Sequence, residues 1–153
     1  LPHRYDYVVE FRHKSWLNDA TWNILSRYQV AYCIVDEPLL PPEIHVTSPI
    51  GYFRWHGHGQ HPWYDYRYTQ QQLQEWVPKI KEVRRNTKKT FGIFNNHFHG
   101  YAPENCIQMM EMLGIAQANH KKTLKRLQNH IERELSGLPP AGTLDQYATP
   151  SSG

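Results

Sequence analysis

The sequence predicts an α/β protein in which parallel strands alternate with helices. Four short apolar segments occur in order along the chain, and each ends abruptly at polar residues. Segments with the apolar spacing of an amphipathic helix follow these strands. We interpret the chain as four successive strand-then-helix units, which predicts a parallel sheet with right-handed crossovers.

The composition favours a single globular domain. The 153 residues are 39% hydrophobic and 13% aromatic, which excludes wholesale disorder. There are 17 Lys and Arg against 14 Asp and Glu, a net charge of only +3. Eleven of the basic residues lie on predicted helices or at their ends, where a solvated face is the ordinary explanation. We therefore do not expect nucleic acid to be the partner.

The ends and cysteines of the chain suggest its setting. No run of 18 apolar residues predicts a membrane-spanning helix, and no charged-then-apolar leader is present. We expect a cytoplasmic protein without a membrane partner. Cys33 and Cys106 are far apart, which predicts buried, reduced thiols. The first residue is Leu1, so we expect a piece of a longer protein or a processed product.

The first two units are defined by clear patterns. Residues 5–11 alternate as a strand does, and Asn18 can cap a helix whose buried face is Trp22, Leu25 and Tyr28. Residues 30–35 form a nearly continuous apolar strand that ends at Asp36. Residues 39–49 have no helical period and predict a long loop.

The third unit begins with a strand at 51–55 that leads into His56 and Gly57. An aromatic-rich loop follows. Thr69 and Gln72 have the spacing of a capping box, and Pro78 predicts a kink or an early break in the helix. The apolar stripe of this helix is Leu73, Trp76, Val77 and Ile80.

The fourth strand, 90–94, has the pattern of a buried parallel strand, and it leads into Asn95, Asn96 and His97. A helix is predicted from Pro103 to near Gly114, and a further helix occupies 116–136. Residues 137–153 are predicted to be a flexible tail. The expected core positions of the two helices are Ile107, Met110 and Leu113, and then Leu124, Leu127, Ile131 and Leu135.

Two architectures fit four such units: an open doubly wound sheet, or half of an eight-stranded barrel. Large side chains on one side of a strand, Val8 with Glu10 and Tyr52 with Arg54, favour a filled barrel interior. A TIM (β/α)8 barrel needs about 200 residues or more, so this chain would be the C-terminal half. Two open sheet edges then predict poor stability or self-association in isolation.

Polar residues follow all four predicted strands, where barrels place their reactive groups. Glu10 and Asp36 are candidates for a general acid and a general base. The alternative is that Arg12 or Arg54 neutralises each carboxylate in a structural ion pair. Both interpretations stay open, and they are compatible because a paired arginine can also bind an anionic substrate.

The loops beyond the strands suggest further contacts. Arg54, His56, Gly57 and Gly59 could form an anion cradle, or the glycines could simply allow a tight turn. Asn95 and Asn96 could hold a substrate hydroxyl or an oxyanion, or could satisfy free backbone groups. The histidines invite a metal hypothesis, but no recognisable zinc spacing occurs, so neither a metal nor a cofactor is predicted. These histidines are His56, His58, His61, His97 and His99.

An ordered series of motifs resembles the YecE-like family, domain of unknown function 72. The motifs lie within Tyr5 to Leu113 and comprise Glu10-Phe11-Arg12-His13-Lys14-Ser15-Trp16, Val35-Asp36, Phe53-Arg54-Trp55-His56-Gly57, Tyr68-Thr69 with Leu73 and Trp76, and Phe94-Asn95-Asn96-His97-Phe98. The resemblance implies a (β/α)8 barrel, with 1–115 as its last four units and the first half absent. It implies no established reaction.

We therefore expect an enzyme or ligand-binding barrel that acts on a small polar, anionic molecule such as a phosphate or a sugar. The candidate catalytic residues are Glu10, Asp36 and His56, and the candidate substrate-binding residues are Arg12, Arg54, Gly57, Asn95, Asn96 and His97. The alternatives are a metal-dependent hydrolase that uses the histidine loops, and a non-catalytic nucleic-acid-binding or scaffold protein. The expected partners are the small ligand and the missing half of the barrel, or a second copy of this chain.

Overall fold

The computed structural model describes residues 5–60 and 62–138 and contains a four-stranded parallel sheet. The strands are β1 (Val8–Val9), β2 (Ala31–Asp36), β3 (Ile50–Trp55) and β4 (Lys89–Phe94), and they lie side by side in chain order. Every neighbouring pair is parallel. The predicted parallel α/β fold is therefore confirmed.

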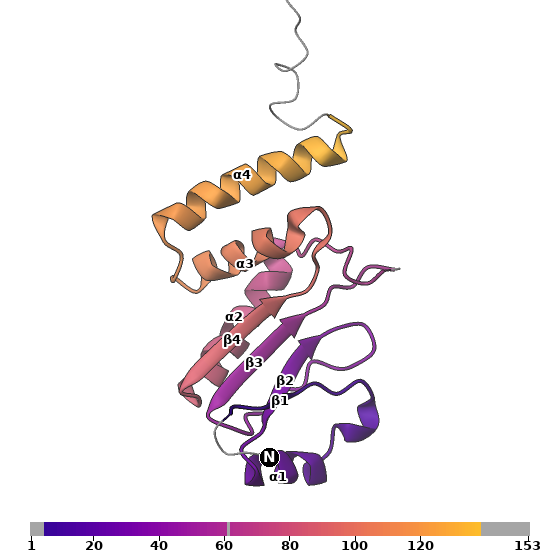
Figure 1. Cartoon of the computed structure of the whole chain (residues 1–153), viewed down its shortest axis with the longest axis vertical. Helices are drawn as coiled ribbons and strands as arrows, with labels where there is room; N and C mark the ends of the chain where they lie inside the picture. The colour runs from indigo at the N-terminus through magenta and orange to yellow at the C-terminus, as the bar shows by residue number, and fades with distance from the viewer. Residues whose placement is uncertain (1–4, 61, 139–153) are drawn as a thin grey trace, which may run out of the picture.

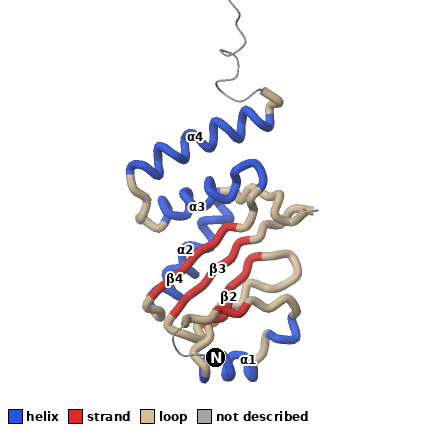
Figure 2. The backbone as a smooth tube through the Cα atoms, viewed as in Figure 1, coloured by secondary structure: helices blue, strands red, loops and turns tan. Residues whose placement is uncertain are grey.

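Four α-helices accompany the sheet: α1 (Asp19–Arg27), α2 (Gln70–Arg85), α3 (Tyr101–Met112) and α4 (Ala118–Leu135). Two 3-10 turns, η1 (Lys14–Trp16) and η2 (Phe98–Gly100), precede α1 and α3. Figure 1 shows α2 behind the sheet, with α3 and α4 stacked beyond the carboxyl end of β4. The same arrangement of helices and strands can be followed in Figure 2.

The core lies between α2 and one face of the sheet. Phe53 and Trp55 of β3 point toward α2 and are almost completely buried. The stripe predicted for α2 is confirmed, because Leu73, Trp76, Val77 and Ile80 are all buried. Burying each such side chain stabilises the fold by about 1.5–3 kcal/mol. At Gly51 a Cβ atom would lie 2.5 Å from Val83 Cγ1, so the glycine lets the helix approach the strand.

No helix of the described residues covers the opposite face of the sheet at β4. Phe91 and Ile93 point to this uncovered face, beside Tyr52 and Arg54 of β3, and they are 44% and 41% exposed. The prediction of a buried fourth strand is therefore wrong. The run is apolar on both faces, but only one face of β4 is packed against helices.

The connection from β2 to β3 contains no helix, which corrects the prediction of four complete strand-then-helix units. Residues 37–49 form a loop, which includes the 39–49 loop that the sequence predicts. The Thr47 hydroxyl accepts from the Tyr32 backbone N–H at 2.8 Å and donates to the Val30 carbonyl at 2.7 Å. This hydroxyl fastens the loop to β2. The first strand is also shorter than predicted, since only Val8–Val9 pairs with β2.

The helix ends agree with the sequence in part. The Asn18 side chain accepts from the Thr21 N–H at 3.0 Å, and Thr69 and Gln72 form a capping box, as predicted. The prediction of an early break at Pro78 is wrong, because α2 continues to Arg85. Tyr28 is 67% exposed because it lies beyond the end of α1.

The last two helices differ modestly from prediction. The third begins at Tyr101, two residues before Pro103. Ile107 is buried, as are Leu124 and Ile131 of α4, whereas Leu135 is exposed in the last turn. Residues 139–153 of the predicted tail lie outside the described residues. Over the part of the chain that is described, no helix combines the length and apolar character that crossing a membrane requires.

Candidate functional site

Glu10 is the centre of a polar cluster on the uncovered face of the sheet. It directly follows β1, and its carboxylate reaches over β2 toward β3. Arg54 Nη1 donates to Glu10 Oε2 at 2.6 Å, and Arg12 Nη2 lies 2.8 Å from Oε1. His56 Nε2 lies 3.0 Å from the same Oε1. Parallel strands deliver these side chains to one edge because their carboxyl ends lie together.

The environment of Glu10 strongly favours its ionised form. Burial of the side chain acts against ionisation and raises the pKa. Hydrogen bonds from His56 and Arg54, together with the charges of these groups, more than offset this effect and lower the pKa of Glu10 from 4.5 to about 2. The carboxylate is therefore charged throughout the physiological range.

His56 connects Glu10 to the end of β4. Asn95 Nδ2 lies 3.2 Å from His56 Nδ1, on the ring edge opposite to Glu10. When the Asn95 amide donates, Nδ1 is the acceptor and the imidazole proton sits on Nε2, from which it is donated to Glu10. The main chain fixes both residues, since His56 N–H donates to the Asp36 carbonyl and Asn95 N–H to the Trp55 carbonyl.

Asp36 does not join this cluster. Its Oδ1 lies 2.9 Å from His58 Nε2, and its carboxylate also interacts with the Tyr68 hydroxyl. In β2, Asp36 pairs with Trp55, so it belongs to the opposite side-chain alternation from Arg54. The predicted carboxylate pair of Glu10 and Asp36 is therefore not formed, and Asp36 instead ties the 57–68 loop to β2.

Asn96 and Gly57, both predicted to bind substrate, make hydrogen bonds within the protein instead of joining the Glu10 cluster. Asn96 is completely buried, and its amide donates to Asn105 Oδ1 and to the Tyr66 carbonyl, both at 2.8 Å. Gly57 has a φ of +95°, and its N–H donates to the Tyr68 hydroxyl at 2.9 Å. A left-handed turn explains this glycine.

His97 lies at the edge of the cluster and is exposed. Its Nδ1 donates to the Asn95 carbonyl at 3.0 Å, and its ring stacks on Tyr64 with centroids 5.2 Å apart. The imidazole therefore links the aromatic loop to the end of β4.

The described histidines have separate partners. His56 lies against Glu10, His58 against Asp36, and His99 against Glu134 and Asp65. Among residues 5–60 and 62–138, no group of three or more His, Cys, Asp or Glu side chains is arranged to hold a metal ion. His61 lies outside the described residues.

Sequence reasoning missed two members of the cluster. The Cys33 thiol points at Glu10 Oε2 from 3.7 Å, and burial raises its pKa, so the thiol stays protonated. Glu37 Oε2 lies 3.9 Å from Arg12 Nη1, and its side chain is only 3% exposed. Strand alternation could have revealed Cys33, because it lies two residues from Val35, which pairs with Arg54.

The fold and the cluster define a parallel α/β protein with a charged site at the carboxyl ends of its strands. The sequence model described as "Protein of unknown function DUF72" matches residues 1–129. The chain belongs to the DUF72 family. The match extends beyond the 5–113 range of the motifs recognised in the sequence.

Known proteins agree with this assignment. The chain is 28% identical to the UPF0759 protein YunF of Bacillus subtilis in an alignment of 131 residues, and the match covers 71% of this chain and 46% of that protein. A crystal structure of a DUF72 family protein from Thermotoga maritima has a TM-score of 0.69 at 33% identity and covers 72% of this chain and 47% of that one. A DUF72 family structure from Enterococcus faecalis has a TM-score of 0.67 at 27% identity, with 74% and 51% covered. The chain thus spans about half the length of these relatives.

Proposed function

We propose that the protein binds a small polar, anionic molecule at the Glu10 cluster, as the substrate of an enzyme or as the ligand of a binding protein. The observation that carries this proposal is that two guanidinium groups and one imidazole converge on a single carboxylate. The distances to Glu10 are 2.6 Å from Arg54, 2.8 Å from Arg12 and 3.0 Å from His56.

The arginines retain capacity for a ligand. A guanidinium has five N–H donors, and only Nη1 of Arg54 is used in the cluster. The Arg12 side chain is 61% exposed, and its second carboxylate, on Glu37, lies at the longer distance of 3.9 Å. A phosphate or carboxylate that approaches over the uncovered face therefore meets unused, geometrically suited donors.

The electrostatics distinguish the roles of Glu10 and His56. A carboxylate with a pKa of about 2 is a weak base and stays ionised at neutral pH, so Glu10 would orient His56 and hold the arginines. His56 would be the proton carrier in any reaction. A substrate that draws the Asn95 amide away from Nδ1 would free that nitrogen as a base, with Glu10 fixing the tautomer as the acid does in a Ser-His-Asp triad.

Substitution of Arg54 tests the ligand proposal. In titrations with inorganic phosphate and with a small sugar phosphate, followed by NMR, Arg54→Ala should weaken binding at least ten-fold while the protein stays folded. Arg126→Ala is the control, because Arg126 is an exposed arginine on α4 and lies outside the cluster. If neither anion binds the wild type and Arg54→Ala unfolds the protein, the arginine is a structural partner of Glu10 and the proposal is wrong.

We also propose that this sheet is the C-terminal half of a (β/α)8 barrel. Strands in sequential parallel order, an uncovered face with large side chains, and relatives about twice as long support the proposal. The partner would be the missing N-terminal half. In its absence we expect the chain to self-associate through the exposed face of β4.

Light scattering after size-exclusion chromatography tests this expectation. Ile93→Lys should reduce the oligomer, because Ile93 lies on the uncovered face. Ile24→Lys should leave it unchanged, because this exposed isoleucine lies on α1. A wild-type chain that remains monomeric at high concentration would contradict the half-barrel proposal.

A further inference from the structure

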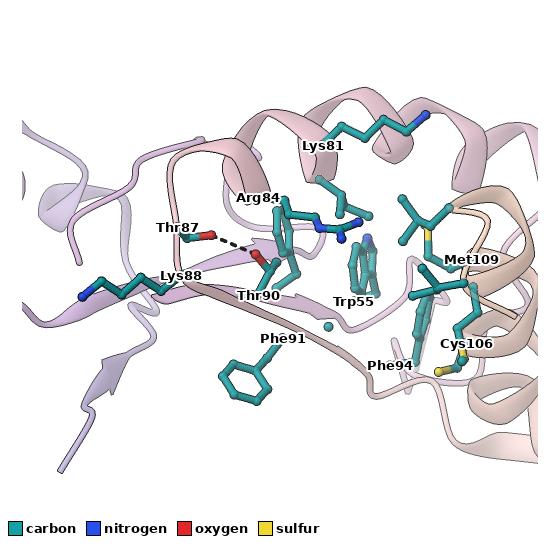
Figure 3. Close-up of a pocket in the computed structure, with 16 residues that line it drawn as sticks. Trp55, Lys81, Arg84, Thr87, Lys88, Thr90, Phe91, Phe94, Cys106 and Met109 are labelled. Carbon is teal, nitrogen blue, oxygen red and sulfur yellow. Dashed lines mark hydrogen bonds between the residues drawn. The ribbon is translucent and has the colours of Figure 1, made fainter. Parts of the chain in front are cut away.

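A cavity lies on the helix side of the sheet, between α2, β4 and α3. Its volume is about 340 Å³, within the range of about 300–1,000 Å³ that small-molecule pockets occupy. None of the residues of the Glu10 cluster lines it. Figure 3 shows side chains from these three elements around it, including Arg84, Phe94 and Cys106.

The wall of this cavity is apolar, and the charges around it are all positive. The apolar wall includes Ile80, Phe94, Met109, Met110, Leu113 and Ile115. Methionine side chains adapt to irregular apolar ligands. Three cations, Lys81, Arg84 and Lys88, line the cavity, and no Asp or Glu does. None of the three has a carboxylate partner within the described part of the chain.

The indole of Trp55 supplies a second, independent feature. Its ring stacks on Phe53 and Phe94, with centroids 5.5 Å and 4.6 Å apart, so the stacking occupies its faces. Trp55 is only 2% exposed, yet its Nε1 has no hydrogen-bond acceptor among residues 5–60 and 62–138. A buried donor without an acceptor costs about 1–3 kcal/mol. In Figure 3 the Arg84 side chain extends toward Trp55.

We propose that this cavity binds an amphipathic monoanion, such as a medium-chain carboxylate. The hydrocarbon part would occupy the apolar interior. The carboxylate would pair with Arg84 and accept from the unused Trp55 N–H, so one ligand would satisfy a cation and an orphaned donor. A strongly polar ligand would leave its polar groups unpaired against the wall, and the surrounding cations would repel a positively charged one.

Cys106 allows binding to be measured at the cavity itself. Cys106 lines the cavity and is only partly buried, whereas the other cysteine, Cys33, is completely buried elsewhere. The chain is alkylated with N-ethylmaleimide, and labelling of Cys106 is followed by peptide mass analysis. Decanoate, below its micelle-forming concentration, should slow this labelling at least five-fold. Decanol, which has the same chain without the charge, should need at least a ten-fold higher concentration for the same protection.

A pair of neighbouring arginines provides the matched variants. Arg84→Ala should raise the decanoate concentration needed for protection at least ten-fold. Arg85→Ala should have no effect, because Arg85 is exposed on the same helix but does not line this cavity. Equal protection by decanoate and decanol, or an unchanged result in Arg84→Ala, would overturn the proposal of an anionic ligand. Absence of any protection would show that the cavity binds neither compound and would also overturn it.

Discussion

Replacing Glu10 with Gln should destabilise the protein in a way that depends on pH. The substitution keeps the size of the side chain but removes the charge that Arg54, Arg12 and His56 surround. In the folded protein the pKa of Glu10 is lowered from 4.5 to about 2. At about 1.4 kcal/mol per pKa unit, this corresponds to about 3 kcal/mol of stability at neutral pH.

The direction of the pH dependence follows from the lowered pKa. A carboxylate that ionises more easily in the folded state stabilises the fold fully above its unfolded pKa, near 4.5. This contribution is lost as the pH falls toward about 2, because both states are then protonated. The wild type should therefore exceed Glu10→Gln by about 3 kcal/mol at pH 7, and the difference should shrink progressively below pH 4.5.

Urea unfolding at a series of pH values between 7 and 2.5 provides the measurement, because the free energy of unfolding extrapolates linearly to zero denaturant. Subtracting the variant from the wild type cancels the titration of all other groups. Glu75→Gln, an exposed position on α2, controls for the loss of a charge and should stay within about 0.5 kcal/mol of the wild type. Parallel pH profiles for the wild type and Glu10→Gln would refute the argument.

Three further substitutions have expected outcomes that urea unfolding can check. Arg67→Ala should cost about 3–5 kcal/mol, because it leaves the completely buried Glu104 carboxylate without its bidentate partner, and adding Glu104→Gln should recover part of the loss. Asn18→Ala should cost about 1 kcal/mol through loss of the cap of α1, whereas Asn18→Asp should keep most of the stabilisation that the cap provides. Gly57→Ala should cost at least about 1 kcal/mol, because the glycine has a φ of +95° and a Cβ would lie 2.5 Å from the Trp63 carbonyl oxygen; an unchanged stability would contradict the steric argument.

The local features of the fold could be read from the sequence. The capping box at Thr69, the cap at Asn18 and the apolar stripe from Leu73 to Ile80 depend on neighbours within a few residues. For the same reason the early break at Pro78 was a reasonable inference, but packing of the stripe on either side holds α2 together.

Burial at β4 could not be read in the same way. An apolar run such as 90–94 indicates which residues favour an apolar environment, but not whether the rest of the chain supplies one on each face. In this chain α2 and α3 cover one side, and Phe91 and Ile93 on the other side remain exposed. The sequence pattern is that of a strand covered on both faces, whereas the described residues cover only one face of β4.

The sequence predicts the candidate site correctly for residues whose position depends only on the end of a strand. Glu10, Arg54 and Asn95 were expected at one edge, and the structure brings the first two into contact and joins the third through His56. Asp36 was expected among them but points the other way. The position of a residue along a strand gives the end at which it lies, whereas its face depends on register, and a shift of one residue reverses it.

Between β2 and β3 a loop takes the place that a crossover helix would occupy on the outside of the sheet. Its anchor is at the far end, where Thr47 is fastened to β2, while Pro41 and Pro42 are exposed at the middle of the loop. Extra chain length inserted between these prolines would project into water without entering the core or shifting the strand register. A reporter peptide or small domain could therefore be carried there without disturbing the packing between the sheet and α2.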